Sequence, residues 1–217
     1  MGNTGTKNMP WAWIKKVDEM IDRTLAKKVE LPVEIMPSLF LSDDRSVLDI
    51  NKLKSLGITH VLSVNGVPSY KGRHISNVYE DNKISHLRVH AEDSEGYGML
   101  EKHWNQCFEF ISTAIEGNSN ARVSVNCAAG VNRSGLIVCA AYMVLEKVEL
   151  IQALEHCIEK RGLILTNKSF QKELCIFADE MNLLGEKPAG MNDDPIPDNY
   201  YLAPPPTTYS KAFDALT

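Results

Sequence analysis

The chain has 217 residues, of which 44% are hydrophobic and 24% are charged. This balance is typical of a globular protein, and the length suits one domain with a sizeable core and additional tails. The formal net charge of −5 argues against general nucleic-acid binding, although it leaves room for a local basic pocket. The five cysteines have neither the spacing of a metal site nor the density of a disulfide-rich scaffold.

Residues 1–10 are expected to form a flexible tip that carries a myristoylation pattern. Gly2 becomes terminal after removal of the first methionine, and Thr6 occupies the position of the small hydroxyl residue. Because so short a pattern recurs by chance, an acylated Gly2 and an unmodified tip both stay open. A single acyl chain would give only weak and reversible membrane association.

Residues 11–30 are expected to hold an amphipathic helix, which the apolar pattern places over 11–28. The apolar residues at helical spacing are Trp13, Val17, Met20, Ile21 and Leu25. A slightly basic helix of this kind could lie on a membrane beside an acyl chain. More often such a stripe packs on its own domain, and we favour packing.

The next 150 residues alternate between strands and helices. The expected strands cover 33–41, 58–64, 87–90 and 122–126, and a long exposed loop covers 65–83. The expected helices cover 49–56, 99–116, 133–145, 150–161 and 170–184, with Thr166 or Asn167 as the cap of the last one. This alternation predicts an α/β fold with a central, mostly parallel sheet flanked by helices and a site at the carboxyl ends of the strands.

Four of the five cysteines and the C-terminal segment indicate the cellular location and the end of the folded domain. Four of the cysteines fall on apolar faces of the expected helices, which indicates core positions in a reducing compartment: Cys107, Cys139, Cys157 and Cys175. No apolar run reaches transmembrane length and no secretory signal is expected, so the predicted location is cytoplasmic, with a membrane-associated fraction if Gly2 is acylated. Residues 185–217 are rich in proline and are expected to form a disordered tail.

One stretch, from Cys127 to Ser134, carries a pattern typical of an anion site. A short strand, a tight loop and a buried helix follow one another there, so free backbone N–H groups and the helix dipole would stabilise a phosphate-sized anion. The residues expected to line this phosphate site are Ala128, Ala129, Gly130, Val131, Asn132 and Arg133. Gly130 permits a positive φ that turns N–H groups inward, and the planar fork of Arg133 can bind two phosphate oxygens.

The same stretch supplies a nucleophile. The local field favours the thiolate form of Cys127, which is the nucleophilic form, and Ser134 can donate a hydrogen bond to its sulfur. A carboxylic acid could protonate the leaving oxygen of a phosphate ester, and the acidic loop over 91–98 offers Glu92, Asp93 and Glu95. These residues predict cysteine-dependent phosphate chemistry.

The pattern Cys-x5-Arg-Ser resembles the phosphate loop of cysteine-dependent phosphatases. The segments 37–41, 57–63 and 166–170 resemble the dual-specificity protein phosphatase branch, and the resemblance covers about residues 31–184. It implies a protein tyrosine phosphatase-like fold and hydrolysis of phosphotyrosine, phosphoserine and phosphothreonine in protein substrates. It also implies a phosphocysteine intermediate without metal or other cofactor, Asp93 as the general acid, and Asn167 as a support of the loop.

The sequence departs from that family at Asn126, where a histidine normally precedes the cysteine. Asparagine can donate hydrogen bonds but cannot be cationic, and an unperturbed thiol is only about 3% thiolate at pH 7, so reduced activity is expected. Two alternatives therefore stay open. One is a phosphate-binding pseudophosphatase, which Asn126 favours and Cys127, Arg133, Ser134 and Asp93 oppose. The other is an RNA 5′-triphosphatase, against which Asp93 and the acidic net charge count. No oligomeric state is indicated.

Overall fold

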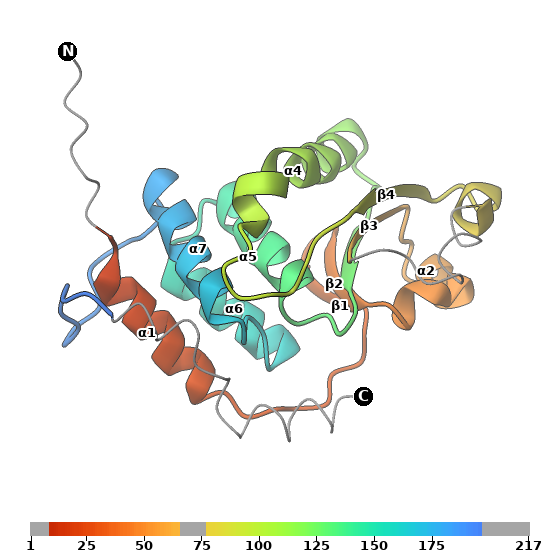
Figure 1. Ribbon diagram of the computed structural model, residues 1–217. Coiled ribbons are helices and arrows are strands. Elements are labelled where there is room, and N and C mark those ends of the chain that lie inside the picture. The colour runs from red at the N-terminus through yellow and green to blue at the C-terminus, as the bar shows by residue number, and fades with distance from the viewer. Residues whose placement is uncertain (1–8, 66–76, 197–217) are drawn as a thin grey trace, which may run out of the picture.

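A five-stranded sheet with helices on both faces forms the centre of the molecule (Figure 1). The computed structural model describes residues 9–65 and 77–196, so Gly2 and residues 197–217 lie outside the described part. The sheet order is β1-β2-β5-β3-β4, in which β1 is antiparallel to β2 and the other neighbours are parallel. This arrangement confirms the predicted α/β fold with a mostly parallel sheet.

The strands and helices follow the chain in alternation. The strands are β1 (Val33–Met36), β2 (Leu39–Asp43), β3 (His60–Val64), β4 (Ser85–Val89) and β5 (Val123–Cys127). The helices are α1 (Trp11–Asp22), α2 (Ile50–Ser55), α4 (Met99–Gly117), α5 (Arg133–Glu146), α6 (Leu150–Arg161) and α7 (Lys168–Glu180), and η1 (Ser46–Leu48) is a short 3-10 helix.

Each face of the sheet has its own apolar core, because side chains alternate between the two faces along a strand. On the larger side, α5 packs against the sheet and is covered by α4, α6 and α7 (Figure 1). Nine of its residues are buried, which explains why its sequence is apolar on every side. On the other side, Phe40 and Val61 pack with Leu53 of α2 and with Tyr79.

Two strand predictions need correction. The predicted strand 33–41 is a hairpin of β1 and β2, and Ser38 at the turn has a φ of 73°. The alternating apolar pattern continues through the turn, so periodicity alone could not reveal the reversal. The predicted strand 87–90 covers Ser85–Val89 instead, because the polar residues Ser85 and His86 lie on an edge strand and pair with β3.

Two further boundaries also differ from the predictions. The predicted loop 65–83 contains a helical turn at residues 77–81, where Tyr79 is buried and its hydroxyl donates to the carbonyl oxygen of Val47 at 2.7 Å. Helix α7 was expected over 170–184 but covers 168–180. Asn167 caps its start, and the positive φ of 57° at Asn182 turns the chain away beyond its end.

Helix α1 packs on the domain, as predicted, but it is shorter than predicted. Its buried residues are Ala12, Ile14, Val17 and Ile21, and the helix contacts α6 and α7. It ends at Asp22 rather than near residue 28, and in the irregular segment that follows Lys27 donates to the carbonyl of Glu159 in α6. Leu25 therefore lies outside the apolar face and is 86% exposed.

The segment that follows α7 contacts helix α1. The indole of Trp13 donates to the carbonyl of Leu184 at 3.0 Å, and Lys15 donates to that of Asn192 at 3.3 Å. Ile196 is buried in the same core as α1. Part of the segment that was expected to be disordered therefore contacts α1 and the core. Within residues 9–65 and 77–196, no helix has the length and apolar character needed to span a bilayer.

The packing of α1 gives a stability prediction. Ile21→Ala removes a fully buried side chain and is expected to lower the free energy of unfolding by about 2–5 kcal/mol. Leu25→Ala, the matched control outside the buried face, is expected to change it by less than about 0.5 kcal/mol. Urea unfolding followed by tryptophan fluorescence measures both, and equal effects would contradict the packing.

Candidate active site

The candidate site lies at the carboxyl end of β5, where the loop 128–132 leads into α5. Cys127 is the last residue of β5 and is 1% exposed, and Arg133 is the first residue of α5. Gly130 has the predicted positive φ, at 63°. A Cβ atom at this position would lie 2.6 Å from the carbonyl oxygen of Ser42, so glycine is required both for conformation and for space.

The carbonyl groups of this phosphate loop (residues 128–132) are all bound from outside the loop. The donors, in order from residue 128 to 132, are Asp44 N (3.5 Å), Arg161 Nη2 (3.0 Å), Arg161 Nε (3.0 Å), Leu165 N (3.1 Å) and Leu136 N (2.8 Å). In the described part of the chain, the N–H groups of residues 128–133 donate no hydrogen bond. These N–H groups are therefore available to an anion.

Arg161, at the end of α6, binds the loop from behind. It is 2% exposed, and its guanidinium donates to the carbonyls of Ala129 and Gly130. Burial lowers the pKa of Arg161, whereas the nearby charges of Asp43 and Cys127 raise it. One cation thus holds two successive peptide groups of the loop in place.

Two predicted residues contact the nucleophile or the mouth of the loop. The hydroxyl of Ser134 donates to the sulfur of Cys127 at 3.1 Å, as predicted. Arg133 donates through Nη1 to the carbonyl of Ala91 at 3.3 Å, and its Nε lies 3.7 Å from Oδ2 of Asp93. Among the described residues, this buried Nε has no hydrogen-bond partner. Its free donor fits the binding of an anion oxygen.

Asp93 and Asn167 come together at the same mouth. The amide of Asn167 donates to Oδ1 of Asp93 at 3.2 Å, and the Asp93 side chain is 27% exposed. Asn132 links this pair to the phosphate loop, because its Oδ1 accepts from Asn167 N at 3.2 Å and from Thr166 Oγ1 at 3.0 Å. Asn167, not Thr166, caps α7.

The two other acidic candidates of this loop lie elsewhere. Glu95 binds the amino end of α7, where it accepts from Lys168 N at 3.1 Å and Ser169 N at 2.9 Å. Glu92 is exposed, and its carboxylate accepts from the hydroxyl of Ser94 at 3.4 Å. Of the three carboxylates, Asp93 is the one that contacts Arg133.

Asn126 lies behind the nucleophile in a buried polar network. Its Nδ2 donates to Oδ1 of Asp44 at 2.7 Å, and its Oδ1 accepts from Ser63 at 2.9 Å. Because the Ser63 hydroxyl has one proton, it must accept from Nε2 of His86, which lies 3.1 Å away. Burial and the charge of Arg88 lower the pKa of His86 to about 4, so this imidazole is neutral at pH 7.

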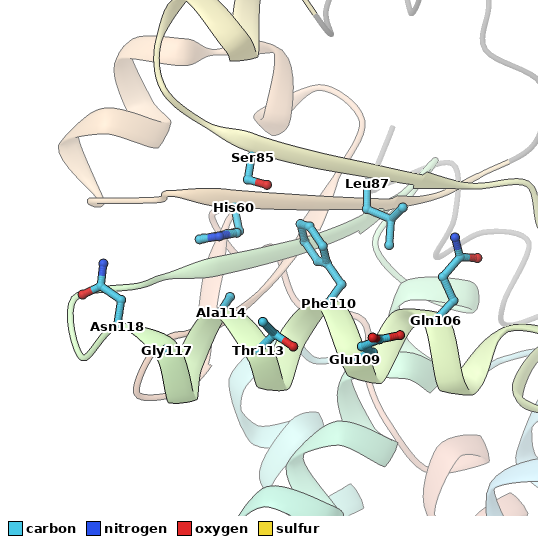
Figure 2. A pocket seen from close by; sticks show the side chains of 10 residues that line it. All are labelled: His60, Ser85, Leu87, Gln106, Glu109, Phe110, Thr113, Ala114, Gly117 and Asn118. Atoms are coloured by element: carbon cyan, nitrogen blue, oxygen red, sulfur yellow. The ribbon is translucent and has the colours of Figure 1, made fainter.

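Among the described residues no metal site is found, and the cavity in Figure 2 lies away from the phosphate loop. Within residues 9–65 and 77–196, no three His, Cys, Asp or Glu side chains gather in a way that could hold a metal ion. A cavity of about 470 Å³ lies between α4 and the edge of the sheet, with Phe110 projecting from the helix (Figure 2). It is lined by His60 and Ser85, the first residues of β3 and β4, and therefore lies toward the opposite end of the sheet from Cys127.

A protein-family comparison agrees with this geometry. The family model described as dual specificity phosphatase, catalytic domain, matches residues 39–180. The chain belongs to the dual specificity phosphatase family. All the loop residues and Asp93 and Asn167 fall within the matched range.

Curated members of the dual specificity phosphatase family are similar over the same region. Dual specificity protein phosphatase 26 from Bos taurus is 33% identical over 141 residues, which cover 65% of this chain and 64% of the relative. The Homo sapiens protein of that name is 32% identical over the same length. Protein phosphatase Slingshot from Drosophila melanogaster is 28% identical over 160 residues, covering 74% of this chain and 14% of that protein. The chain therefore matches somewhat less than two thirds of the length of the first of these relatives.

Solved structures of dual specificity phosphatases have the same fold. Human DUSP28 superposes with a TM-score of 0.60 at 21% identity, covering 72% of this chain and 99% of that one. DUSP15 gives a TM-score of 0.57 at 22% identity, with coverages of 74% and 97%.

Three residues of this dual specificity phosphatase site were not found from the sequence. Arg161 was treated as the end of a helix, Glu95 as a competing acid, and Asp44 was not singled out. Each makes its contact with a distant part of the chain. Arg161 binds Gly130, which is 31 residues away, and Asp44 binds Asn126, which is 82 residues away. Glu95 binds Lys168 and Ser169, which are 73 and 74 residues away. The burial of Arg161, which is unusual for an arginine, becomes apparent only in the folded chain.

The shape of the phosphate loop gives a prediction at Gly130. Gly130→Ala should lower the free energy of unfolding by about 3 kcal/mol, from the strained φ and the clash with Ser42, and weaken binding of inorganic phosphate about ten-fold or more. Gly190→Ala is the control, since Gly190 has a φ of 76° but no atom within 4 Å of an added Cβ. It should cost only about 1 kcal/mol and leave phosphate binding unchanged. Calorimetric titration with phosphate and thermal unfolding measure both effects.

Proposed function

We propose that this protein is a cysteine-dependent phosphatase that hydrolyses phosphotyrosine, phosphoserine and phosphothreonine in proteins. One observation carries the proposal: the phosphate loop has every carbonyl bound from outside and every N–H from 128 to 133 free within the described chain, around a buried cysteine. Six donors and the Arg133 fork suit the oxygens of a phosphoryl group.

The first step forms a phosphocysteine. The Cys127 thiolate attacks phosphorus, the bond from phosphorus to the ester oxygen breaks, and Asp93 in its acid form protonates the leaving oxygen. The loop N–H groups and Arg133 stabilise the equatorial oxygens, where negative charge is spread in the transition state. The contact of Asp93 with Arg133 supports this role, because Arg133 is the residue that we propose binds the phosphoryl oxygens.

The second step releases phosphate. Water attacks phosphorus and gives a proton to the Asp93 carboxylate, while the sulfur–phosphorus bond breaks and the thiolate is restored. The Ser134 hydroxyl, 3.1 Å from the sulfur, stabilises the leaving thiolate. No step uses a metal or an organic cofactor.

The substrate class, the cellular location and the membrane association are also proposals. We expect a phosphoprotein substrate, no nucleic acid and a cytoplasmic location. Gly2, which lies outside the described residues, would add weak membrane association if it were myristoylated. The family match supports phosphoproteins over triphosphate-ended RNA.

The nucleophile and Asn126 can be tested together. Cys127→Ser should reduce hydrolysis of 4-nitrophenyl phosphate by about 10³-fold or more. Asn126→His should raise it at pH 7, because an imidazolium would add a positive charge beside Asp44. Rates measured from pH 5 to 8 give both results.

The control for the nucleophile is Cys107→Ser, which changes another buried thiol, on α4, and should keep full activity. Failure of both the native chain and Asn126→His to turn over substrate, with measurable phosphopeptide binding, would replace the enzyme by the pseudophosphatase, which Asn126 favours.

Asp93 is tested by varying the leaving group. Asp93→Asn should lower the rate with phenyl phosphate by about 10²-fold or more, since phenoxide needs a proton, and should affect 4-nitrophenyl phosphate much less. Steady-state kinetics with the two esters give the comparison. An equal loss with both would rule out Asp93 as the acid.

A further inference from the structure

The loop that carries Asp93 is tied to helix α7 by a second carboxylate. Glu95 accepts from the backbone N–H groups of Lys168 at 3.1 Å and Ser169 at 2.9 Å. These groups belong to the first turn of α7, where N–H groups have no acceptor within the helix. The exposed side chain of Glu95 therefore binds the start of a helix that lies 73 and 74 residues further along the chain.

The start of α7 is also fixed to the phosphate loop. Asn132 of that loop accepts from the backbone N–H of Asn167 at 3.2 Å, and the Asn167 side chain donates to Asp93 at 3.2 Å. Asp93 and the phosphate loop are thus both bonded to the start of α7, in addition to the direct contact of Asp93 with Arg133. Glu95 makes a further connection to the start of α7 two residues after Asp93.

The anchor point itself is held by buried charge. The ammonium group of Lys168 is paired with Asp18 of α1 and lies 3.9 Å from Asp22, and its side chain is 8% exposed. In contrast, the segment beside Asp93 contains Gly96, with a φ of 80°, and Gly98. Arg133 and Asn167 hold the residues 91 and 93, and Glu95 is the contact nearest the two glycines, where the backbone is least restricted.

We propose that Glu95 is a positioning residue, which keeps Asp93 at the mouth of the phosphate loop by anchoring the loop 91–98 to the amino end of α7. The inference rests on the proposed function, in which Asp93 is the general acid. A residue that served only as a helix cap would affect stability and all substrates alike. A residue that positions the acid affects the substrates that need a proton.

The kinetic test compares Glu95→Ala and Glu95→Gln with Glu92→Gln in the full chain. Glu95→Ala should lower kcat for phenyl phosphate about five- to ten-fold, the size expected for loss of a helix cap, and leave kcat for 4-nitrophenyl phosphate within about two-fold. Glu95→Gln keeps one carbonyl acceptor and should be intermediate. Glu92→Gln removes the same charge on the other side of Asp93 and should change neither rate. Equal losses with the two esters, or no loss, would overturn the inference.

A second measurement does not depend on activity. Hydrogen–deuterium exchange of the loop 91–98 should rise in Glu95→Ala and stay at the native level in Glu92→Gln, in the native background and in Cys127→Ser. Unchanged exchange in Glu95→Ala would show that Glu95 does not hold the loop. If the native chain hydrolyses neither ester, the proposed function fails, and the exchange result still decides whether the anchor exists.

Discussion

The phosphate loop depends on one constraint, which is that its carbonyl groups are held away from its centre. In a planar peptide group the N–H and the C=O point in nearly opposite directions, so binding the carbonyls from outside turns the N–H groups inward. Arg161 does this for two peptide groups, and the backbone N–H groups of Asp44 and Leu165 do it for two more. Gly130 allows the curve because no Cβ stands against Ser42. Neighbours of the loop thus fix the direction of its N–H groups without any ligand.

The network behind Cys127 shows what an asparagine does where this family usually has histidine. Asn126 satisfies the buried hydroxyl of Ser63 and the carboxylate of Asp44, so the loop keeps a hydrogen-bonded support. An amide, however, adds no positive charge to offset that carboxylate, whereas an imidazolium would. His86, two bonds along the network, does not supply the charge either, since burial and Arg88 lower its pKa to about 4. Support of the loop and stabilisation of a thiolate are therefore separate properties here.

Sequence reasoning succeeded where chemistry is local and failed where it depends on distant contacts. Cys127, Arg133 and Ser134 lie within eight residues on one strand–loop–helix turn, so their spacing fixed their geometry. The apolar pattern also predicted that α1 packs on the domain, but it could not show that the helix stops before Leu25, since the pattern continues past Asp22. Glu95 was only a competitor of Asp93 for the role of the acid, and its contact with the start of α7 could not be foreseen because that partner is more than 70 residues away.

The phosphate loop and the loop 91–98 are consequently held in place by different contacts. The phosphate loop is held by hydrogen bonds from the residue after β2, from α6 and from the chain before α7, whereas the loop 91–98 is bonded to helix starts. The cap position of α4 is Gly98, which has no side chain, and Glu173 of α7 accepts the three free N–H groups from 99 to 101 instead. Burial raises the pKa of Glu173, and these N–H groups oppose that rise. Because α7 also pairs with α1 through Lys168, a change in α1 can reach the loop of Asp93 without passing through Cys127. The start of α7 is also bonded to the phosphate loop, because Asn132 accepts from the backbone N–H of Asn167, so one helix end contacts both loops of the candidate site.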